Sequence, residues 1–247
     1  MSPFFSSTLD LSVLNSRRRP WQPNTPKPNS ETSKASNTIS KCLALTNLEP
    51  AVATFITTGL DRQDSSRLSP EMIQTLRRNI EDESKHEIAL TNARNAMLDY
   101  DSSFETEAEN ICKEWLELTD NPIVTAAVME NSIFFLILPI YSLFGGSSLR
   151  QTSADISQDE RIHVQSHRQA AMDLGVKPSK ALNSLRLKTV EWISQDIGEL
   201  GVNWSLDRMI KNSNSLLQRG ISDLVETKSA GVLAPFELNN TNISTYS

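Results

Sequence analysis

The chain has 247 residues, a formal net charge of −6, 8 glycines and 2 cysteines. Scarce glycine disfavours a turn-rich β fold, and the negative charge argues against binding to nucleic acid. Cys42 and Cys112 have no metal-ligand or redox spacing, so reduced thiols in a cytoplasmic compartment are expected.

Residues 1–40 are expected to form a disordered basic arm. Residues 1–41 contain six Lys and Arg against two Asp and Glu, and "RRRPWQPNTPKPNS" stands at their centre. Such a composition cannot bury enough apolar surface to fold alone. Because the arm is rich in Ser and Arg and poor in acids, a transit peptide for organellar import is the alternative to a cytoplasmic location.

Apolar residues recur at helical spacing through most of the remaining chain, which predicts an all-α protein. Ser69 and Pro70 form a typical helix start, an N-cap followed by proline at the first helical position. Polar residues 61–70 and the "GGSS" of 145–148 interrupt the pattern. The predicted helices are 40–60, 70–98, 104–119, 122–144, 151–174, 178–199 and 203–227. The expected domains are the arm, a helical domain at 41–230 and a flexible tail at 231–247.

The segment 123–144 is apolar enough to span a bilayer. Glu130 and Asn131 lie inside it and Pro139 interrupts it, and a carboxylate near a bilayer centre costs about 2.5 kcal/mol or more. We therefore expect a buried core helix and no membrane association. Glu130 must then be protonated, paired or bound to a metal.

Two short stretches, "DESKH" and "DERIH", carry the same pattern of Glu and His three residues apart. They place Glu83 with His86, and Glu160 with His163, on one face of each helix. Two of the three histidines of the chain lie in this pattern. One copy occurs readily by chance. Two solvated helix faces are the simpler alternative, but they leave Glu130 unexplained.

Two lone acids occupy matching positions upstream of the pairs. Counted from the turn that joins each predicted helix pair, Glu49 lies level with Glu83, and Glu130 lies about one turn from the level of Glu160. Four carboxylates and two neutral imidazoles are balanced by two divalent cations, whereas a buried cluster without metal is untenable. Oxygen and imidazole ligands without thiolate favour iron or manganese over structural zinc.

Three further residues are expected near these groups. Asp82 and Asp159 directly precede the motif glutamates, and each can accept the spare N–H of a ligating histidine from the opposite helix. His167 lies one turn beyond His163. It is either an extra ligand, a hydrogen-bonding group beside the site, or an ordinary surface or core histidine.

Taken together, the two motifs and their upstream glutamates resemble the ferritin-like di-iron carboxylate superfamily over roughly residues 41–175. The resemblance implies a ferritin-like four-helix bundle with a crossover helix at 104–119 and two additional C-terminal helices. It implies Glu49 and Glu130 as terminal ligands, Glu83 and Glu160 as bridging ligands, and His86 and His163 as imidazole ligands. Pro50 departs from the family pattern, and predicts a kink or a helix that begins near Asn47.

The resemblance also implies a reaction with O₂ at two iron ions, with manganese as the alternative metal. The first hypothesis is an oxidase or oxygenase, a homodimer that takes electrons from a donor protein and oxidises a small-molecule or carrier-bound substrate. The second is a radical-generating subunit like the small subunit of ribonucleotide reductase, although Leu90 stands at the usual radical-tyrosine position. The third is iron storage or peroxide scavenging, which the long C-terminal part of the chain disfavours.

Overall fold

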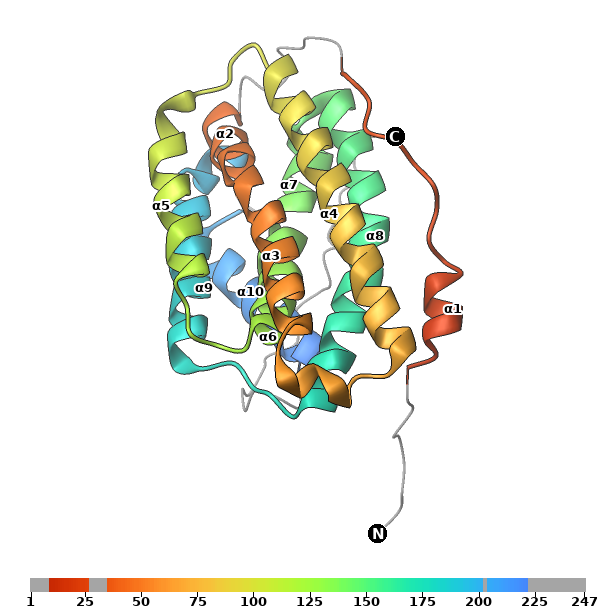
Figure 1. Cartoon of the computed structure of the whole chain (residues 1–247). Coiled ribbons are helices and arrows are strands. Elements are labelled where there is room, and N and C mark those ends of the chain that lie inside the picture. The colour runs from red at the N-terminus through yellow and green to blue at the C-terminus, as the bar shows by residue number, and fades with distance from the viewer. Residues whose placement is uncertain (1–8, 27–34, 202–203, 222–247) are drawn as a thin grey trace.

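The computed structural model describes residues 9–26, 35–201 and 204–221, the last four by their backbone alone. Every regular element in these ranges is a helix, which confirms the all-α prediction (Figure 1). The α-helices are α1 (Leu11–Asn15), α2 (Ser36–Ala44), α3 (Leu48–Leu60), α4 (Pro70–Ala96), α5 (Glu105–Leu116), α6 (Pro122–Met129), α7 (Phe135–Phe144), α8 (Gly146–Leu174), α9 (Lys180–Ser194) and α10 (Leu206–Ile221).

Four long helical segments surround the central core. Helix α3 packs against α4, α4 packs against α8, α8 packs against α6 and α7, and α6 returns to α3. Helix α5 lies along the side of this group and leads the chain from the end of α4 back to the level at which α6 begins (Figure 1). Helices α9 and α10 pack against each other, and α10 also contacts α6, α7 and α8.

Local sequence signals explain where several of the helices begin or end. Ser69 accepts a hydrogen bond from the backbone N–H of Met72, and Pro70 opens α4 as predicted. Asn121 and Ser179 cap α6 and α9 in the same way. Helix α8 ends at Gly175, whose φ of 67° is left-handed and favours glycine.

The predicted helix at 40–60 is two helices joined by a 3₁₀ turn at Leu45–Asn47. Helix α3 begins at Leu48, next to the predicted start near Asn47. Pro50 therefore lies in the first turn, where its missing N–H removes no helical hydrogen bond. This placement allows Glu49 to sit in the first turn of a regular helix, immediately before a proline.

The apolar segment at 122–144 is also divided. Helix α6 ends at Met129, a π-helical turn covers Glu130–Phe134, and α7 continues to Phe144. By length and composition the whole segment passes as a possible membrane span, but its most apolar window is 100% buried within the structure. That burial is the environment expected of a core helix.

The break between α7 and α8 is shorter than predicted. Helix α8 begins at Gly146 rather than at residue 151, so Ser147 and Ser148 are helical. A Cβ on Gly145 would lie 2.3 Å from the Leu149 Cβ, and Gly146 has a left-handed φ of 66°. These two glycines alone make the sharp turn. Of the C-terminal predictions, the end of the last helix at 222–227 and the tail at 231–247 lie outside the described residues.

The prediction of a disordered arm is wrong for residues 9–26. Leu11 and Leu14 of α1 are buried, and the Asn15 side chain donates a hydrogen bond of 2.8 Å to the Thr75 hydroxyl of α4. The Asn92 side chain, also on α4, donates to the backbone oxygen of Asn24 at 3.0 Å. The arm has no core of its own, but it packs against the helical bundle. The composition of the arm does not reveal such contacts with distant parts of the chain. After the arm, α2 begins at Ser36, before the predicted boundary at residue 41. Residues 1–8 and 27–34 of the arm lie outside the described part.

Candidate metal centre

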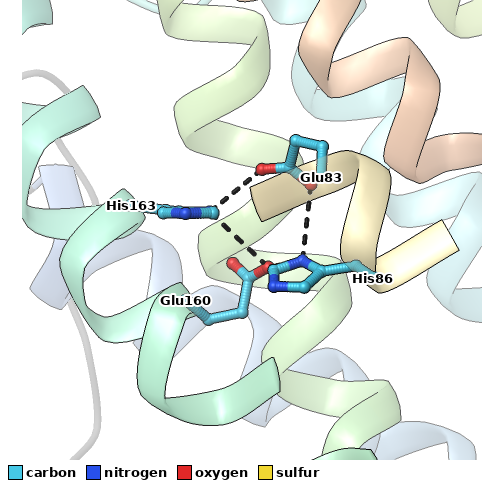
Figure 2. Close-up of side chains that lie close together, drawn as sticks. All are labelled: Glu83, His86, Glu160 and His163. Atoms are coloured by element: carbon cyan, nitrogen blue, oxygen red, sulfur yellow. Dashed lines mark ion pairs between the residues drawn. The ribbon is translucent and has the colours of Figure 1, made fainter. Parts of the chain in front are cut away.

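Four buried side chains meet between α4 and α8 and form a group that could hold a metal ion (Figure 2). Glu83 and His86 come from α4, and Glu160 and His163 come from α8; one ligand atom from each lies within 4.8 Å of the others. The three-residue spacing places each pair on one helix face. Because α4 packs on α8, the two faces point toward each other.

The contacts within this group cross between the two helices. His163 Nδ1 lies 2.9 Å from Glu83 Oε1, and His86 Nδ1 lies 3.3 Å from Glu160 Oε1. Within each helix the separations are longer, 3.6 Å for Glu83 with His86 and 3.8 Å for Glu160 with His163. Each imidazole therefore faces both glutamates through its Nδ1 atom.

The two lone glutamates join the same centre from the other side. Glu49 Oε2 lies 3.5 Å from His86 Nδ1, and Glu130 Oε1 lies 3.4 Å from His163 Nδ1. Both side chains have 0% exposure. Four separate helical segments thus bring together the six side chains for which the sequence analysis predicted a ligand role.

The inward-facing polar atoms of this centre lack hydrogen-bond partners among the described residues. This holds for both carboxylate oxygens of all four glutamates and for Nδ1 of His86 and His163. The atoms lie close together, yet none of their contacts has hydrogen-bond geometry. Burying so many unpaired polar atoms is costly. A cation bound among them would satisfy the oxygen and nitrogen lone pairs, so the donor set fits a metal.

Two aspartates contact the outer nitrogens of the histidines. His86 Nε2 lies 3.3 Å from Asp159 Oδ2, and His163 Nε2 lies 3.4 Å from Asp82 Oδ2. The predicted contact with the opposite helix is present in both cases. A carboxylate at Nε2 favours a proton on that nitrogen, which leaves Nδ1 with its lone pair directed to the centre.

The N-terminal arm reaches both aspartates, a feature that the sequence analysis missed. The Trp21 indole N–H donates to Asp159 Oδ2 at 2.7 Å, and its ring stacks on His86 with centroids 6.0 Å apart. Arg18 forms an ion pair with Asp82, which Lys85 also contacts. The signal available in the sequence was "RRRPW", a run of cations and an indole in an otherwise polar segment.

His167 lies beside Glu130 rather than on the surface. Its Nδ1 is 2.6 Å from Glu130 Oε2, and its Nε2 is 3.1 Å from the Asn79 Nδ2 atom. Arg18 donates to the Asn79 amide oxygen, so the amide NH₂ faces His167. Nε2 then accepts a hydrogen bond from Asn79, and Nδ1 is the ring nitrogen that faces Glu130.

Burial and mutual charge shift the pKa values of the clustered groups in opposite directions. Burial raises the pKa of Glu49 well above its usual range, and burial with the nearby Glu130 charge raises the pKa of Glu160 to about 8. Burial also raises the pKa of Glu83, but the facing His163 outweighs it and holds that pKa well below its usual range. In the metal-free protein, protons bound to some of these groups therefore offset part of the negative charge of the cluster.

The histidines show the complementary shift. Burial lowers their pKa values, but the surrounding carboxylates outweigh it and hold the pKa of His86 and of His163 well above the usual range. A metal ion would take over the neutralising role of these protons.

Glu130 lies in the π-helical turn, and α10 supports this turn. The Ser213 hydroxyl donates to the backbone oxygen of Ser132 at 3.0 Å, and the Asn131 side chain donates to the backbone oxygen of Leu216. The π turn widens the helix at the residue that carries the carboxylate, a feature frequent at functional sites.

Comparison with known proteins adds no further information about this centre, because no family model, curated protein or solved structure matches the chain.

Proposed function

We propose that this chain is a ferritin-like di-metal carboxylate protein that uses two iron ions to activate O₂ and oxidise a substrate. The observation that carries the proposal is the meeting of four buried glutamates and two buried histidines whose inward atoms have no hydrogen-bond partner among the described residues. The helix order supports the ferritin-like reading, since α3 with α4, and α6–α7 with α8, form two packed pairs that α5 connects.

Charge supports two ions rather than one. Four carboxylates balance two divalent cations, whereas one cation would leave a net negative charge in a centre where all six side chains have at most 1% exposure. The contacts suggest the division of ligands. Glu49 with His86 would hold one ion, Glu130 with His163 would hold the other, and Glu83 and Glu160 would bridge them.

Ferrous ions held by these six side chains would supply the electrons that reduce O₂. The chain itself holds the ligands in place and keeps water out through burial. Asp159 and Asp82 hold the outer protons of His86 and His163, so that both imidazoles present a lone pair to the centre. Trp21 and Arg18 hold these aspartates in turn.

The test is anaerobic titration of the metal-free protein with Fe(II), followed by exposure to O₂. We expect two iron ions per chain and consumption of O₂ accompanied by a change in the visible spectrum. Mn(II) titration in parallel identifies the preferred metal. Glu81, an exposed acid on the same helix as Glu83, provides the control variant Glu81→Gln, which should bind and react normally. Less than half an equivalent of bound iron would reject the proposal.

A second candidate, a radical-generating subunit, is favoured by Tyr141. Its side chain is 1% exposed, and its hydroxyl has no hydrogen-bond partner among the described residues. Burial raises its pKa well above the usual range, with a smaller contribution from the negative charges of nearby groups such as Glu49. Leu90, at the position usual for a radical tyrosine, cannot serve. Electron paramagnetic resonance after rapid O₂ mixing separates the two functions: a long-lived tyrosyl signal that Tyr141→Phe abolishes would favour the radical generator.

A further inference from the structure

A cavity on α8 is lined by none of the six side chains that meet at the metal centre. It has a volume of about 610 Å³ and is bounded by the N-terminal arm, α7 and α8. Cavities of this size hold small organic molecules. Ser157, Arg161 and Gln165 line it at four-residue spacing, so they form a stripe of α8 different from the one that carries Glu160 and His163. The cavity is therefore a site distinct from the metal centre.

The polar wall of this cavity is cationic. Arg17 and Arg19 of the arm and Arg161 of α8 line it, and none of the lining residues is Asp or Glu. The whole chain has 30 acidic residues against 24 Lys and Arg, so a wall with three guanidinium groups and no acid is the reverse of the overall charge balance of the chain. Guanidinium groups pair best with carboxylate and phosphate oxygens.

The floor of the cavity is apolar. Phe135, Leu138 and Pro139 of α7 and Ile162 of α8 form it, and each is buried. An inorganic anion could pair with the arginines but would leave the apolar floor exposed to water. A molecule with an apolar body and an anionic head matches both surfaces.

We propose that this cavity binds a small organic anion, with a carboxylate or phosphate head held by Arg17, Arg19 and Arg161 and an apolar body lying on α7 and α8. The three consecutive arginines of the arm lie at two different sites. Arg17 and Arg19 line the cavity, and Arg18 between them pairs with Asp82 beside the metal centre. An anion in the cavity would thus hold down the same arm segment that contacts the metal-centre aspartate.

Calorimetric titration of the full chain tests the proposal, with decanoate, decyl phosphate and decanol as probes below their micelle concentrations. We expect decanoate, decyl phosphate or both to bind one per chain, at least roughly tenfold more tightly than decanol, since a charge-assisted contact is lost with the alcohol. If only one anion binds, its head identifies the preferred group. Equal affinity for decanol and both anions, or no binding of either anion, would overturn the proposal.

Matched variants locate the site. The double variant Arg17→Gln with Arg19→Gln should weaken anion binding at least roughly tenfold. The control double variant Arg77→Gln with Arg78→Gln makes the same charge change at exposed positions of α4 and should bind normally. Equal affinities of the two variants would place the anion elsewhere. All four of these arginine side chains are exposed, so circular dichroism should show unchanged helix content in both variants.

The titrations are run on both metal-free and Fe(II)-loaded protein, which separates this proposal from the proposed function. Anion binding in a protein that retains no iron would leave the cavity proposal standing and reject the di-iron centre. Two bound iron ions without anion binding would give the opposite result.

Discussion

The two halves of the metal centre use the same motif but different backbones to complete it. In the first half, α4 carries Glu83 and His86, and Glu49 joins from the first turn of α3, directly before Pro50. In the second half, α8 carries the motif, and Glu130 joins from a π-helical turn inside a long buried segment. A helix start and a π turn are therefore alternative ways to direct a lone carboxylate at a facing histidine.

The halves also differ one turn beyond each motif histidine. His167 follows His163 by four residues and contacts Glu130, whereas Leu90 follows His86 by four residues and is a buried apolar side chain. The partners of the two aspartates differ as well. Arg18 and Lys85 contact Asp82, while Trp21 donates to Asp159. The second half thus has an additional polar group at its lone glutamate. The neutral partner Trp21 lies at Asp159, the aspartate that faces His86 of the first half.

The largest loss of bound metal is expected from substitution of the motif glutamate, which both halves have. Glu83→Gln and Glu160→Gln should each lose both ions, because each glutamate faces both histidines and would bridge the metals. Elemental analysis after Fe(II) loading measures this, with Glu81→Gln as the control. If either variant retained two ions, that glutamate would not be a shared ligand.

Substitution of either lone glutamate should remove less metal, and each should affect a different ion. Glu49→Gln and Glu130→Gln are each expected to lose one ion, because each faces a different histidine. Glu130→Gln also removes an acid from the most apolar helical segment, so the metal-free variant should be as stable as the parent or more stable by about 1 kcal/mol. Urea unfolding of the metal-free proteins measures this. Full metal content in Glu130→Gln would show that the residue is not a ligand.

The stability of the metal-free protein should depend on pH in the direction opposite to metal binding. The pKa of Glu160 rises from 4.5 to about 8 on folding, so its contribution to the stability of the metal-free protein falls as pH rises between these values. The raised pKa values of His86 and His163 act in the same direction above pH 6.5. The depressed pKa of Glu83 leaves its contribution constant above its usual value of 4.5.

The melting temperature of the metal-free protein should therefore fall between pH 5.5 and pH 8, whereas iron affinity should rise because metal displaces protons. Thermal unfolding followed by circular dichroism, with and without Fe(II), checks both statements. A metal-free protein that becomes more stable across this interval would contradict the assigned shifts.

His167→Leu would give the second half the side chain that the first half has at Leu90. Because His167 contacts Glu130, we expect the affinity for one of the two ions to fall roughly tenfold and that for the other to stay unchanged. Titration with Co(II), followed in the visible spectrum, resolves the two binding steps. Equal weakening of both steps would show that the asymmetry between the halves has no effect on the metals.

The smallest effect is expected on the unfolding free energy, from substitutions in the N-terminal arm. Trp21→Phe removes the indole hydrogen bond to Asp159 and should cost about 1 kcal/mol of unfolding free energy. Arg18→Gln should cost less, because Lys85 remains beside Asp82. Urea unfolding of metal-free protein measures both, and Arg17→Gln is the exposed control. Equal costs for Trp21→Phe and Arg17→Gln would show that the indole contact contributes nothing to stability.

The sequence by itself determined the helices and the two Glu-x-x-His faces, because helix caps and i,i+3 spacing depend only on neighbouring residues. It also singled out Glu130, since an acid in a long apolar helix needs a partner. Glu49 could be identified by its distance from the turn between α3 and α4, which approximates its height along a helix pair.

Only the tertiary structure decided how these pieces meet. The π turn at Glu130 has no local signal comparable to a cap, and it is held by Ser213 and by the contact of Asn131 with the backbone of α10. The arm was predicted to be disordered because it cannot form a core alone, yet Trp21 reaches an aspartate 138 residues away in the chain. Such contacts depend on surfaces that exist only after the helices have packed, so no local pattern of residues can predict them.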